Sequence, residues 1–257
     1  MTDDEKLQKL HSLGCSFRTS TSELHPHLKA SLTKSVVGMM VHHPLLVSFF
    51  PEGMEDSLNE AYEFKRKRVE EALAEKNYRN FVFTYERAYR VDAFMDIADR
   101  LTQQEHWSLF SDVWTDSENI HESMETWLEL LYGFQDDPQL MMGEEDRQHY
   151  DALPDEFTIY RGGVDDNGLS WTLDRELALW FASRFKKDHE VFERKIQKKE
   201  ALAYLSDRSE QEIIYSPDPW WHLRGGIWKK TTSLMRNGRT SRNWNEEGEA
   251  PCQDQQS

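Results

Sequence analysis

Apolar and charged residues alternate from about residue 28 to residue 133 with the period of amphipathic helices. Apolar side chains recur at steps of three and four with charged residues between them, so they fall on one face of each predicted helix. The recurring positions are Leu58, Ala61, Tyr62, Val69, Ala72 and Leu73, then Tyr89, Ala93, Phe94, Ile97 and Leu101, then Ile120, Met124, Trp127, Leu128, Leu131 and Tyr132. The pattern predicts a helical N-terminal region over residues 28–150.

The composition changes over residues 133–154, which contain a Gln-Asp-Asp-Pro connector and an acidic segment at 143–146 that is expected to start another helix. Short extended segments follow. Runs of apolar residues bounded by turn residues predict strands at residues 157–161, 169–172, 191–196, 201–205 and 212–215. A helix is predicted from Asp174, between the second and third of these strands. Its buried face is expected to carry Leu177, Trp180, Phe181 and Phe185.

The order of these patterns divides the chain into four parts and predicts an α+β fold. A polar arm at residues 1–27 precedes the helical region at 28–150. The strand-rich part covers residues 151–235. Residues 236–257 are polar and end in Gln-Asp-Gln-Gln-Ser, so we expect them to be disordered.

The composition is that of a globular protein with an acidic surface. The 257 residues are 38% hydrophobic and 12% aromatic, enough for a core in one large or two small domains. Lysine and arginine number 31 and aspartate and glutamate 47, so the net charge is −16. Phosphate contacts require an excess of basic residues, so this charge argues against a general nucleic-acid-binding protein. A local basic patch, such as the run at residues 65–68, stays compatible with it.

The sequence also argues against a secreted or membrane protein. The chain begins with an acidic segment, where a signal peptide is basic. The most apolar stretch, residues 36–50, is too short to span a bilayer. Cys15 and Cys252 can form at most one disulfide, and His25 and His27 have no acidic or cysteine support nearby. We therefore expect a cytoplasmic protein with no membrane partner and no metal.

Three short segments of the strand-rich part carry groups suited to a phosphorylated ligand. They are Tyr160-Arg161-Gly162, Ser170-Trp171-Thr172 and Glu210-Gln211-Glu212. The planar guanidinium of Arg161 can bind two phosphate oxygens, and the following glycine lets a ligand approach the backbone. In an extended segment the hydroxyls of Ser170 and Thr172 point to one face. Glu210 and Glu212 have the same spacing, so we expect them to share a face if both are extended.

The order and spacing of these segments resemble the mono-ADP-ribosyltransferase fold, in the branch named for its Arg, Ser and Glu motifs. Residues 168–182 and 202–214 are similar to a prokaryotic and phage group of that fold, as is the segment at 114–119. The motif match covers residues 157–216. The resemblance implies that residues 151–235 form a split β-sandwich catalytic domain in a phage or bacterial protein, acting in the host cytoplasm if phage-encoded.

The resemblance implies an enzyme that breaks the bond between nicotinamide and ribose in NAD. Such a reaction passes through an oxocarbenium-like state, related to that of glycoside hydrolysis. Glu212 matches the catalytic glutamate, which hydrogen-bonds a ribose hydroxyl, and Ser170 matches the serine that orients it. Glu210 matches the first glutamate, which favours an arginine-like acceptor and could assist its deprotonation.

The resemblance also assigns NAD-binding roles to residues of the first two segments. Arg161 would hold the NAD phosphates or the adjacent ribose, and the backbone of Gly162 would approach the nicotinamide amide. Tyr160 belongs to the same NAD-binding segment, and Thr172 supports its strand. The chain departs from the common pattern at Trp171, where a small residue is frequent, and this bears on the shape of the pocket more than on the chemistry.

Several functions stay open at the level of sequence. The favoured function is transfer of ADP-ribose to a macromolecule, with a protein favoured over a nucleic acid and arginine as a possible acceptor. The alternatives are a pure NAD glycohydrolase and a catalytically silent module whose acidic helical half docks on a partner protein. Each segment taken alone is also typical of a surface ion pair, a cap or a solvated strand edge. The acceptor, the role of the helical half and the oligomeric state are not determined by the sequence.

Overall fold

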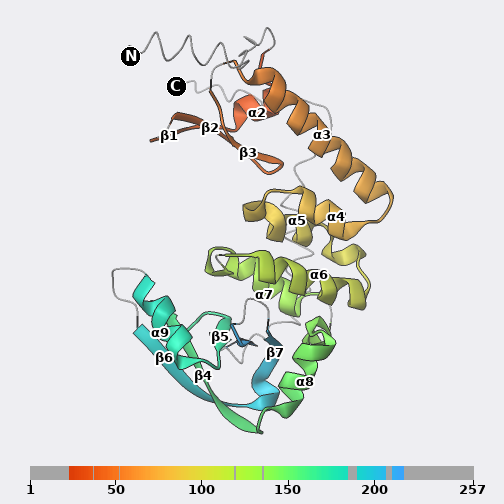
Figure 1. The fold of residues 1–257 in the computed structure, drawn as a ribbon. Coiled ribbons are helices and arrows are strands. Elements are labelled where there is room, and N and C mark those ends of the chain that lie inside the picture. The colour runs from red at the N-terminus through yellow and green to blue at the C-terminus, as the bar shows by residue number, and fades with distance from the viewer. Residues whose placement is uncertain are drawn as a thin grey trace, which may run out of the picture. The chain divides into compact units, whose positions relative to one another are not determined.

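The computed structural model describes residues 23–216, except residues 37, 52, 119, 135, 185–189 and 207–209 (Figure 1). These residues form two compact units. The first contains the described residues up to Trp127 together with Asp137–Gln148, and the second contains Leu128–Asp136 and the described residues from His149 onward. The polar tail predicted from residue 236 and all but the last residues of the predicted arm lie outside the described residues.

The first unit begins with a short helix and a three-stranded sheet. Helix α2 (Pro26–Ala30) precedes three antiparallel strands, β1 (Leu32–Ser35), β2 (Gly38–His43) and β3 (Leu46–Phe49). The prediction of a wholly helical region is therefore wrong here. Along β2, Val41 and His43 are buried and His42 between them is exposed, which is the two-residue period of a strand.

Helices form the chain from residue 55 to residue 152. They are α3 (Glu55–Ala74), α4 (Tyr78–Thr84), η1 (Arg87–Tyr89), α5 (Arg90–Ile97), η2 (Ala98–Arg100), α6 (Gln103–Asp116), η3 (Ile120–Ser123), α7 (Met124–Tyr132), η4 (Pro138–Met141) and α8 (Glu144–Ala152). Aromatic rings fill the core of the first unit, where Trp127 lies 5.1 Å from Phe110 and 5.0 Å from Trp114 between ring centroids. The predicted helical character of this stretch is confirmed.

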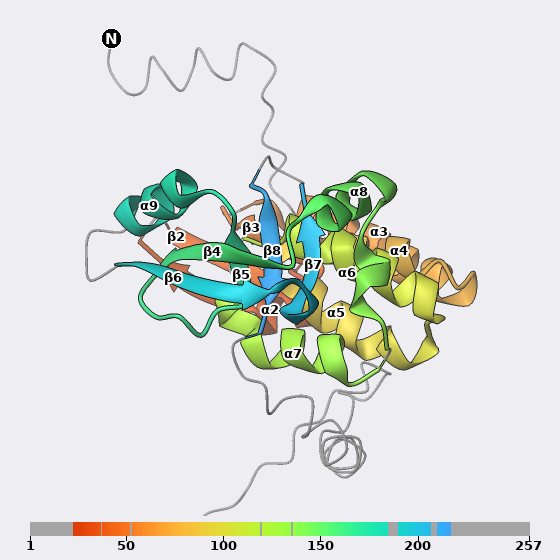
Figure 2. The same cartoon turned by 90° about the horizontal axis from the view of Figure 1, so that it is seen from below.

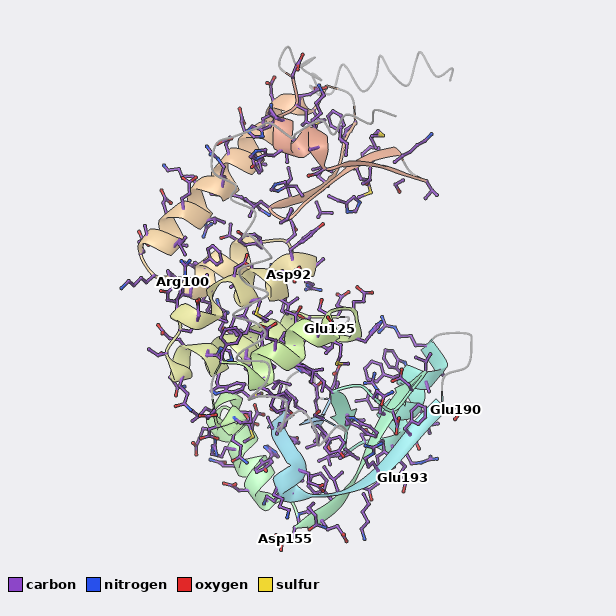
Figure 3. The ribbon with its side chains drawn as sticks, turned by 180° about the vertical axis from the view of Figure 1, so that it is seen from behind. Asp92, Arg100, Glu125, Asp155, Glu190 and Glu193 are labelled. Carbon is purple, nitrogen blue, oxygen red and sulfur yellow. The ribbon has the colours of Figure 1, made fainter. Side chains whose placement is uncertain are left out.

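The second unit contains a five-stranded antiparallel sheet. Its elements are β4 (Glu156–Gly163), β5 (Ser170–Thr172), α9 (Arg175–Arg184), β6 (Glu190–Gln197), η5 (Lys198–Glu200), β7 (Ala201–Leu205) and β8 (Glu212–Tyr215). The strand order is β6-β4-β5-β8-β7, so the three segments singled out in the sequence reach the adjacent strands β4, β5 and β8. Figure 3 labels Asp155 next to the start of β4, and Glu190 and Glu193 along β6. All five predicted strands and the α+β class are confirmed.

Helix α9 packs along β4 and also meets β6, as Figure 2 shows. It begins as predicted, because the carboxylate of Asp174 accepts the backbone N–H of Glu176 at 2.8 Å and caps the first turn. Its buried face differs from the prediction. Ala178 is fully buried, whereas Trp180 is 54% exposed, and Phe185 lies outside the described residues. The small alanine faces the sheet because the helix approaches β4 closely.

Within the described part of the chain, none of the helices combines the length and the apolar character that crossing a membrane requires.

Candidate functional site

Ser170 and Glu212 lie on adjacent strands and are joined by a hydrogen bond. Strands β5 and β8 pair Ser170 with Ile214 and Thr172 with Glu212. Side chains at paired positions share a face, as do those two residues apart, so Ser170, Thr172 and Glu212 point to the same side of the sheet. The hydroxyl of Ser170 donates to Oε1 of Glu212. A serine on one strand therefore orients a carboxylate on the next.

The guanidinium of Arg161 contacts the same serine from β4, the strand on the other edge of β5 from β8. Its Nη1 donates to the carbonyl oxygen of Ser170 at 2.8 Å, and its Nε makes a weaker contact to the carbonyl oxygen of Asp165 at 3.4 Å. Ser170 thus contacts Glu212 through its side chain and Arg161 through its backbone. One short strand connects the predicted phosphate-binding arginine with the predicted catalytic glutamate.

Gly168 is a part of the site that the sequence reasoning missed. A Cβ at this position would lie 1.9 Å from Cζ of Arg161, so the guanidinium occupies the space of the missing side chain. The glycine was visible in the sequence only as a turn residue after Asn167. The contact with Arg161 is seven residues back along the chain and has no local signal. Only glycine leaves room for the guanidinium at this place.

The charge of Arg161 is not neutralised by a direct ion pair. Among the described residues, no carboxylate lies within 4.0 Å of its guanidinium, and Nη2 has no hydrogen-bond acceptor. Burial lowers the pKa of Arg161, while the nearby carboxylates of Asp165 and Glu212 oppose this effect. A half-buried guanidinium with an unused edge attracts an anion such as a phosphate.

Arg194 on β6 provides a contrast within the same sheet. Its Nη2 forms an ion pair with the carboxylate of Asp166 at 2.5 Å. Its guanidinium lies over the rings of Trp171 and Tyr215, with Cζ 5.5 Å and 5.6 Å from their centroids. Arg194 therefore has protein partners around it, and Arg161 is the arginine that is available to a ligand.

Thr172 holds the segment that precedes Glu212. Its hydroxyl donates to the carbonyl oxygen of Glu210 at 2.7 Å and accepts the backbone N–H of Asp174 at 3.0 Å. The side chain is buried, with 6% of its surface exposed. Thr172 therefore connects β5 both to the residues that precede β8 and to the start of α9, and its role in the site is structural.

Glu210 is close to Glu212 in the chain but is not related to it by strand geometry. The residue between them, Gln211, has a φ of +45°, which is the left-handed region, and β8 begins only at Glu212. The condition under which the two glutamates were expected to share a face, that both are extended, is therefore not met. Glu210 is half-buried, and its carbonyl oxygen is held by Thr172, whereas Gln211 is exposed.

Gly162 is required by helix packing. A Cβ at this position would lie 2.1 Å from the carbonyl oxygen of Ala178 and 2.6 Å from the backbone nitrogen of Ala182. The space that a side chain at this position would fill is thus occupied by the backbone of α9, which is a reason for glycine here that the sequence reasoning did not give. Tyr160 pairs with Thr172 and is half-buried on the same face.

Trp171 faces away from the two hydroxyls that flank it. The side chain is 2% exposed, and its indole N–H donates to the carbonyl oxygen of Gly168 at 2.8 Å. Because adjacent strand residues point to opposite faces, the large ring does not enter the side that carries Ser170 and Glu212. The tryptophan therefore does not take up space on the side that carries Ser170 and Glu212.

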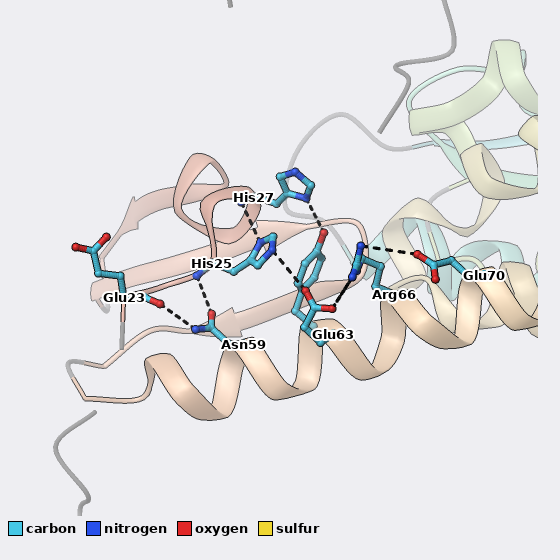
Figure 4. A network of polar contacts seen from close by, with 8 residues as sticks. Glu23, His25, His27, Asn59, Glu63, Arg66 and Glu70 are labelled. Atoms are coloured by element: carbon cyan, nitrogen blue, oxygen red, sulfur yellow. Dashed lines mark hydrogen bonds and ion pairs between the residues drawn. The ribbon is translucent and has the colours of Figure 1, made fainter. Parts of the chain in front are cut away.

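A second polar cluster lies in the first unit and is shown in Figure 4. His27 Nδ1 lies 2.7 Å from the hydroxyl of Tyr62, and His25 Nε2 lies 3.5 Å from the carboxylate of Glu63. Burial, and after it the neighbouring histidines, lower the pKa of His43 to about 4. Within the described ranges, no group of three or more histidine, cysteine or acidic side chains is arranged to hold a metal ion. This cluster joins α2 and β2 to α3.

The second unit thus brings Arg161, Ser170, Thr172 and Glu212 together, with Glu210 held beside them through its backbone. In comparisons with known proteins, no family model, no curated protein and no solved structure matches this chain.

Proposed function

We propose that this protein is an NAD-dependent mono-ADP-ribosyltransferase that modifies a macromolecular target. The observation that carries the proposal is the position of Ser170, whose hydroxyl bonds Glu212 and whose carbonyl oxygen bonds Arg161. A phosphate-binding cation and a carboxylate then lie on β4 and β8, the two strands that flank β5, as a substrate with both a diphosphate and a reactive ribose requires. The proposal includes an ADP-ribosyltransferase-like domain over residues 151–235, to which the five-stranded sheet belongs.

The proposed reaction cleaves the bond between the nicotinamide nitrogen and C1 of the attached ribose. Nicotinamide leaves with the bonding electron pair, and positive charge develops on the ribose. The carboxylate of Glu212 lowers the energy of this state more than that of bound NAD, because the charge is greatest in the transition state. The hydrogen bond from Ser170 keeps that carboxylate in one orientation before the substrate arrives.

Arg161 supplies the anchoring of the diphosphate. Two of its nitrogens are engaged with main-chain oxygens, which fixes the plane of the guanidinium. Its Nη2 edge, for which the described residues offer no acceptor, is free to bind phosphate oxygens. A fixed arginine binds an anion with little loss of side-chain entropy.

The acceptor in the proposal is a nucleophile on a protein, with arginine as the favoured residue. The nucleophile forms a bond to C1 of the ribose and gives up a proton, for which the carboxylate of Glu210 is the proposed base. The carbonyl of this glutamate is fixed by Thr172 at 2.7 Å, so its side chain starts from a defined backbone position next to Glu212.

The experiment is incubation of the full chain with NAD labelled in the adenine moiety, with and without a cell lysate. We expect release of nicotinamide and transfer of label to a protein, both abolished by Glu212→Gln. Glu156→Gln is the matched control, because Glu156 is an exposed glutamate at the start of β4 that pairs with Lys195. Absence of nicotinamide release from the wild-type chain under all conditions contradicts the proposal.

The same experiment separates the two alternatives. Release of nicotinamide without transfer of label to any acceptor identifies an NAD glycohydrolase. Binding of NAD without release identifies a silent module. The packing of α9 against Gly162 favours the silent module over an enzyme, because that packing explains the glycine without a ligand. Mass spectrometry of labelled lysate proteins identifies the modified residue.

A further inference from the structure

The turn between β4 and β5, residues 164–169, is held by an ion pair between Asp166 and Arg194. Neither residue has a role in the proposed reaction. We propose that Arg194 is a positioning residue that acts through Asp166: the pair fixes this turn, and the turn fixes the guanidinium of Arg161. The consequence for NAD binding rests on the proposed function, whereas the consequence for the guanidinium of Arg161 does not.

Arg194 is itself held in one place. It lies on β6, and its guanidinium stands over Trp171 at 5.5 Å and over Tyr215 at 5.6 Å. These two rings meet edge to face, with centroids 5.9 Å apart. The aromatic faces and the cation attract one another, which favours this position of the arginine. From this position it reaches out to the carboxylate of Asp166 at 2.5 Å.

The same aromatic residues also hold the end of the turn. The indole N–H of Trp171 donates to the carbonyl oxygen of Gly168 at 2.8 Å. The backbone N–H of Tyr215 donates to the carbonyl oxygen of Leu169 at 2.9 Å. Asp166 is the remaining attachment, in the middle of the turn. Without its ion pair the first half of the turn keeps, among the described residues, the local bond from Asn167 N–H to the carboxylate of Asp165 at 3.0 Å and the weak contact of Arg161 Nε with the Asp165 carbonyl oxygen at 3.4 Å.

The turn in its observed position forms one wall around Arg161. The carbonyl oxygen of Asp165 accepts from Nε, and Gly168 packs so closely that a Cβ would lie 1.9 Å from Cζ. The one hydrogen bond of the guanidinium to an acceptor outside the turn, among the described residues, is to the carbonyl oxygen of Ser170. Movement of Asp165 therefore leaves Arg161 with a single hydrogen bond, to Ser170, and loosens the orientation of its guanidinium.

The effect of the Arg194–Asp166 pair on the position of Arg161 can be measured separately from its effect on the stability of the fold. The side chains of Arg194 and Asp166 are 29% and 45% exposed, and ion pairs of this exposure contribute little to the free energy of folding. Asp166→Asn and Arg194→Gln are therefore expected to fold. Lys195→Gln is the matched control, because Lys195 is the next residue of β6 and forms an exposed ion pair with Glu156 at 2.5 Å.

The test uses the full chain and two readouts. The first is the rate at which the Arg161 Nε proton exchanges with water, followed by nuclear magnetic resonance and assigned with Arg161→Lys. The second is the dissociation constant for ADP-ribose. We expect severalfold faster exchange and about tenfold weaker binding in Asp166→Asn and in Arg194→Gln, the size of effect that a displaced binding group produces. The double variant is expected to be no worse than the weaker-binding single variant, because both changes break one connection.

Unchanged exchange at Arg161 in both single variants overturns the inference, and so does an equal effect of Lys195→Gln. If the wild-type chain binds no ADP-ribose but exchange at Arg161 still responds to Asp166→Asn, the positioning role stands and the proposed function fails. If ADP-ribose binds and neither readout responds to the variants, the proposed function stands and the positioning role fails.

Discussion

The hydroxyl of Ser170 on β5 donates a hydrogen bond to the carboxylate of Glu212 on the adjacent strand β8. We expect Ser170→Ala to lower the rate of nicotinamide release by about 10- to 100-fold, because a hydrogen bond to a charged group contributes about 1.5–3 kcal/mol. Ser183→Ala is the control, since the Ser183 hydroxyl donates to the carbonyl oxygen of Trp180 at an exposed place on α9. Equal rates for the Ser170 variant and the wild type would show that the hydrogen bond from Ser170 does not orient Glu212 for the reaction.

Thr172 connects β5 to both the Glu210 carbonyl and the start of α9. Thr172→Val keeps the shape of the side chain and removes both hydrogen bonds. We expect a loss of about 1–3 kcal/mol of stability, because the N–H of Asp174 and the carbonyl of Glu210 lose their partner. Thr172→Ser restores the hydroxyl and is expected to recover most of the loss. Urea denaturation of the three proteins measures this, and a serine variant no better than valine would contradict the prediction.

Gly162 and Gly143 form a matched pair of glycine positions. A Cβ at residue 162 would meet the backbone of α9 at 2.1 Å, whereas a Cβ at residue 143 would meet nothing within 4 Å. We expect Gly162→Ala to cost about 3 kcal/mol or more, because a rigid backbone segment must move. Gly143→Ala is expected to change stability by less than about 0.5 kcal/mol. Similar denaturation midpoints for the two variants would show that α9 does not rest on Gly162.

The histidine cluster of the first unit predicts how stability depends on pH. The pKa of His43 is lowered to about 4 from an unperturbed 6.5, so between these values the unfolded chain binds more protons than the folded one. Stability therefore falls as pH drops from 6.5 towards 4, by at most about 3 kcal/mol for this residue. Urea denaturation at several pH values in this range measures the slope.

The control for this prediction compares neighbouring histidines on β2. His43→Gln is expected to flatten the pH dependence, whereas His42→Gln, at an exposed position of the same strand, is expected to leave it nearly unchanged. The comparison uses the slope with pH, because burying glutamine at position 43 also has a constant cost. An unchanged slope in the His43 variant would assign the acid sensitivity to other groups.

Local patterns predicted most elements of the fold and failed at one place. The strands around Ile159 and Ile213 were predicted because short apolar runs are bounded there by turn residues, and the helix after Asp174 because a capping carboxylate precedes an apolar face. The sheet at residues 32–49 was missed because its strands are short and Met, Leu and Phe fit either period. Burial on one side of β2 is what reveals the strand period.

The sequence predicted which residues belong to the candidate site, but it did not predict the contacts of its two glycines. Gly162 was predicted to let a ligand approach the backbone and also leaves room for α9, and Gly168 was predicted to lie in a turn and also leaves room for the guanidinium of Arg161. Each of these contacts joins residues at least seven positions apart. A shared face for Glu210 and Glu212 depended on an extended backbone, and one left-handed residue between them, Gln211, interrupts it.

The sequence by itself determined the elements of the second unit and the order in which its arginine, serine and glutamate occur, because helix and strand periods and turn residues act over a few neighbouring positions. Only the tertiary structure decided that β4, β5 and β8 lie side by side, that Ser170 contacts both Arg161 and Glu212, and that Arg194 reaches the turn beside Arg161. These relationships depend on strand order and register, which are set by packing between segments far apart in the chain.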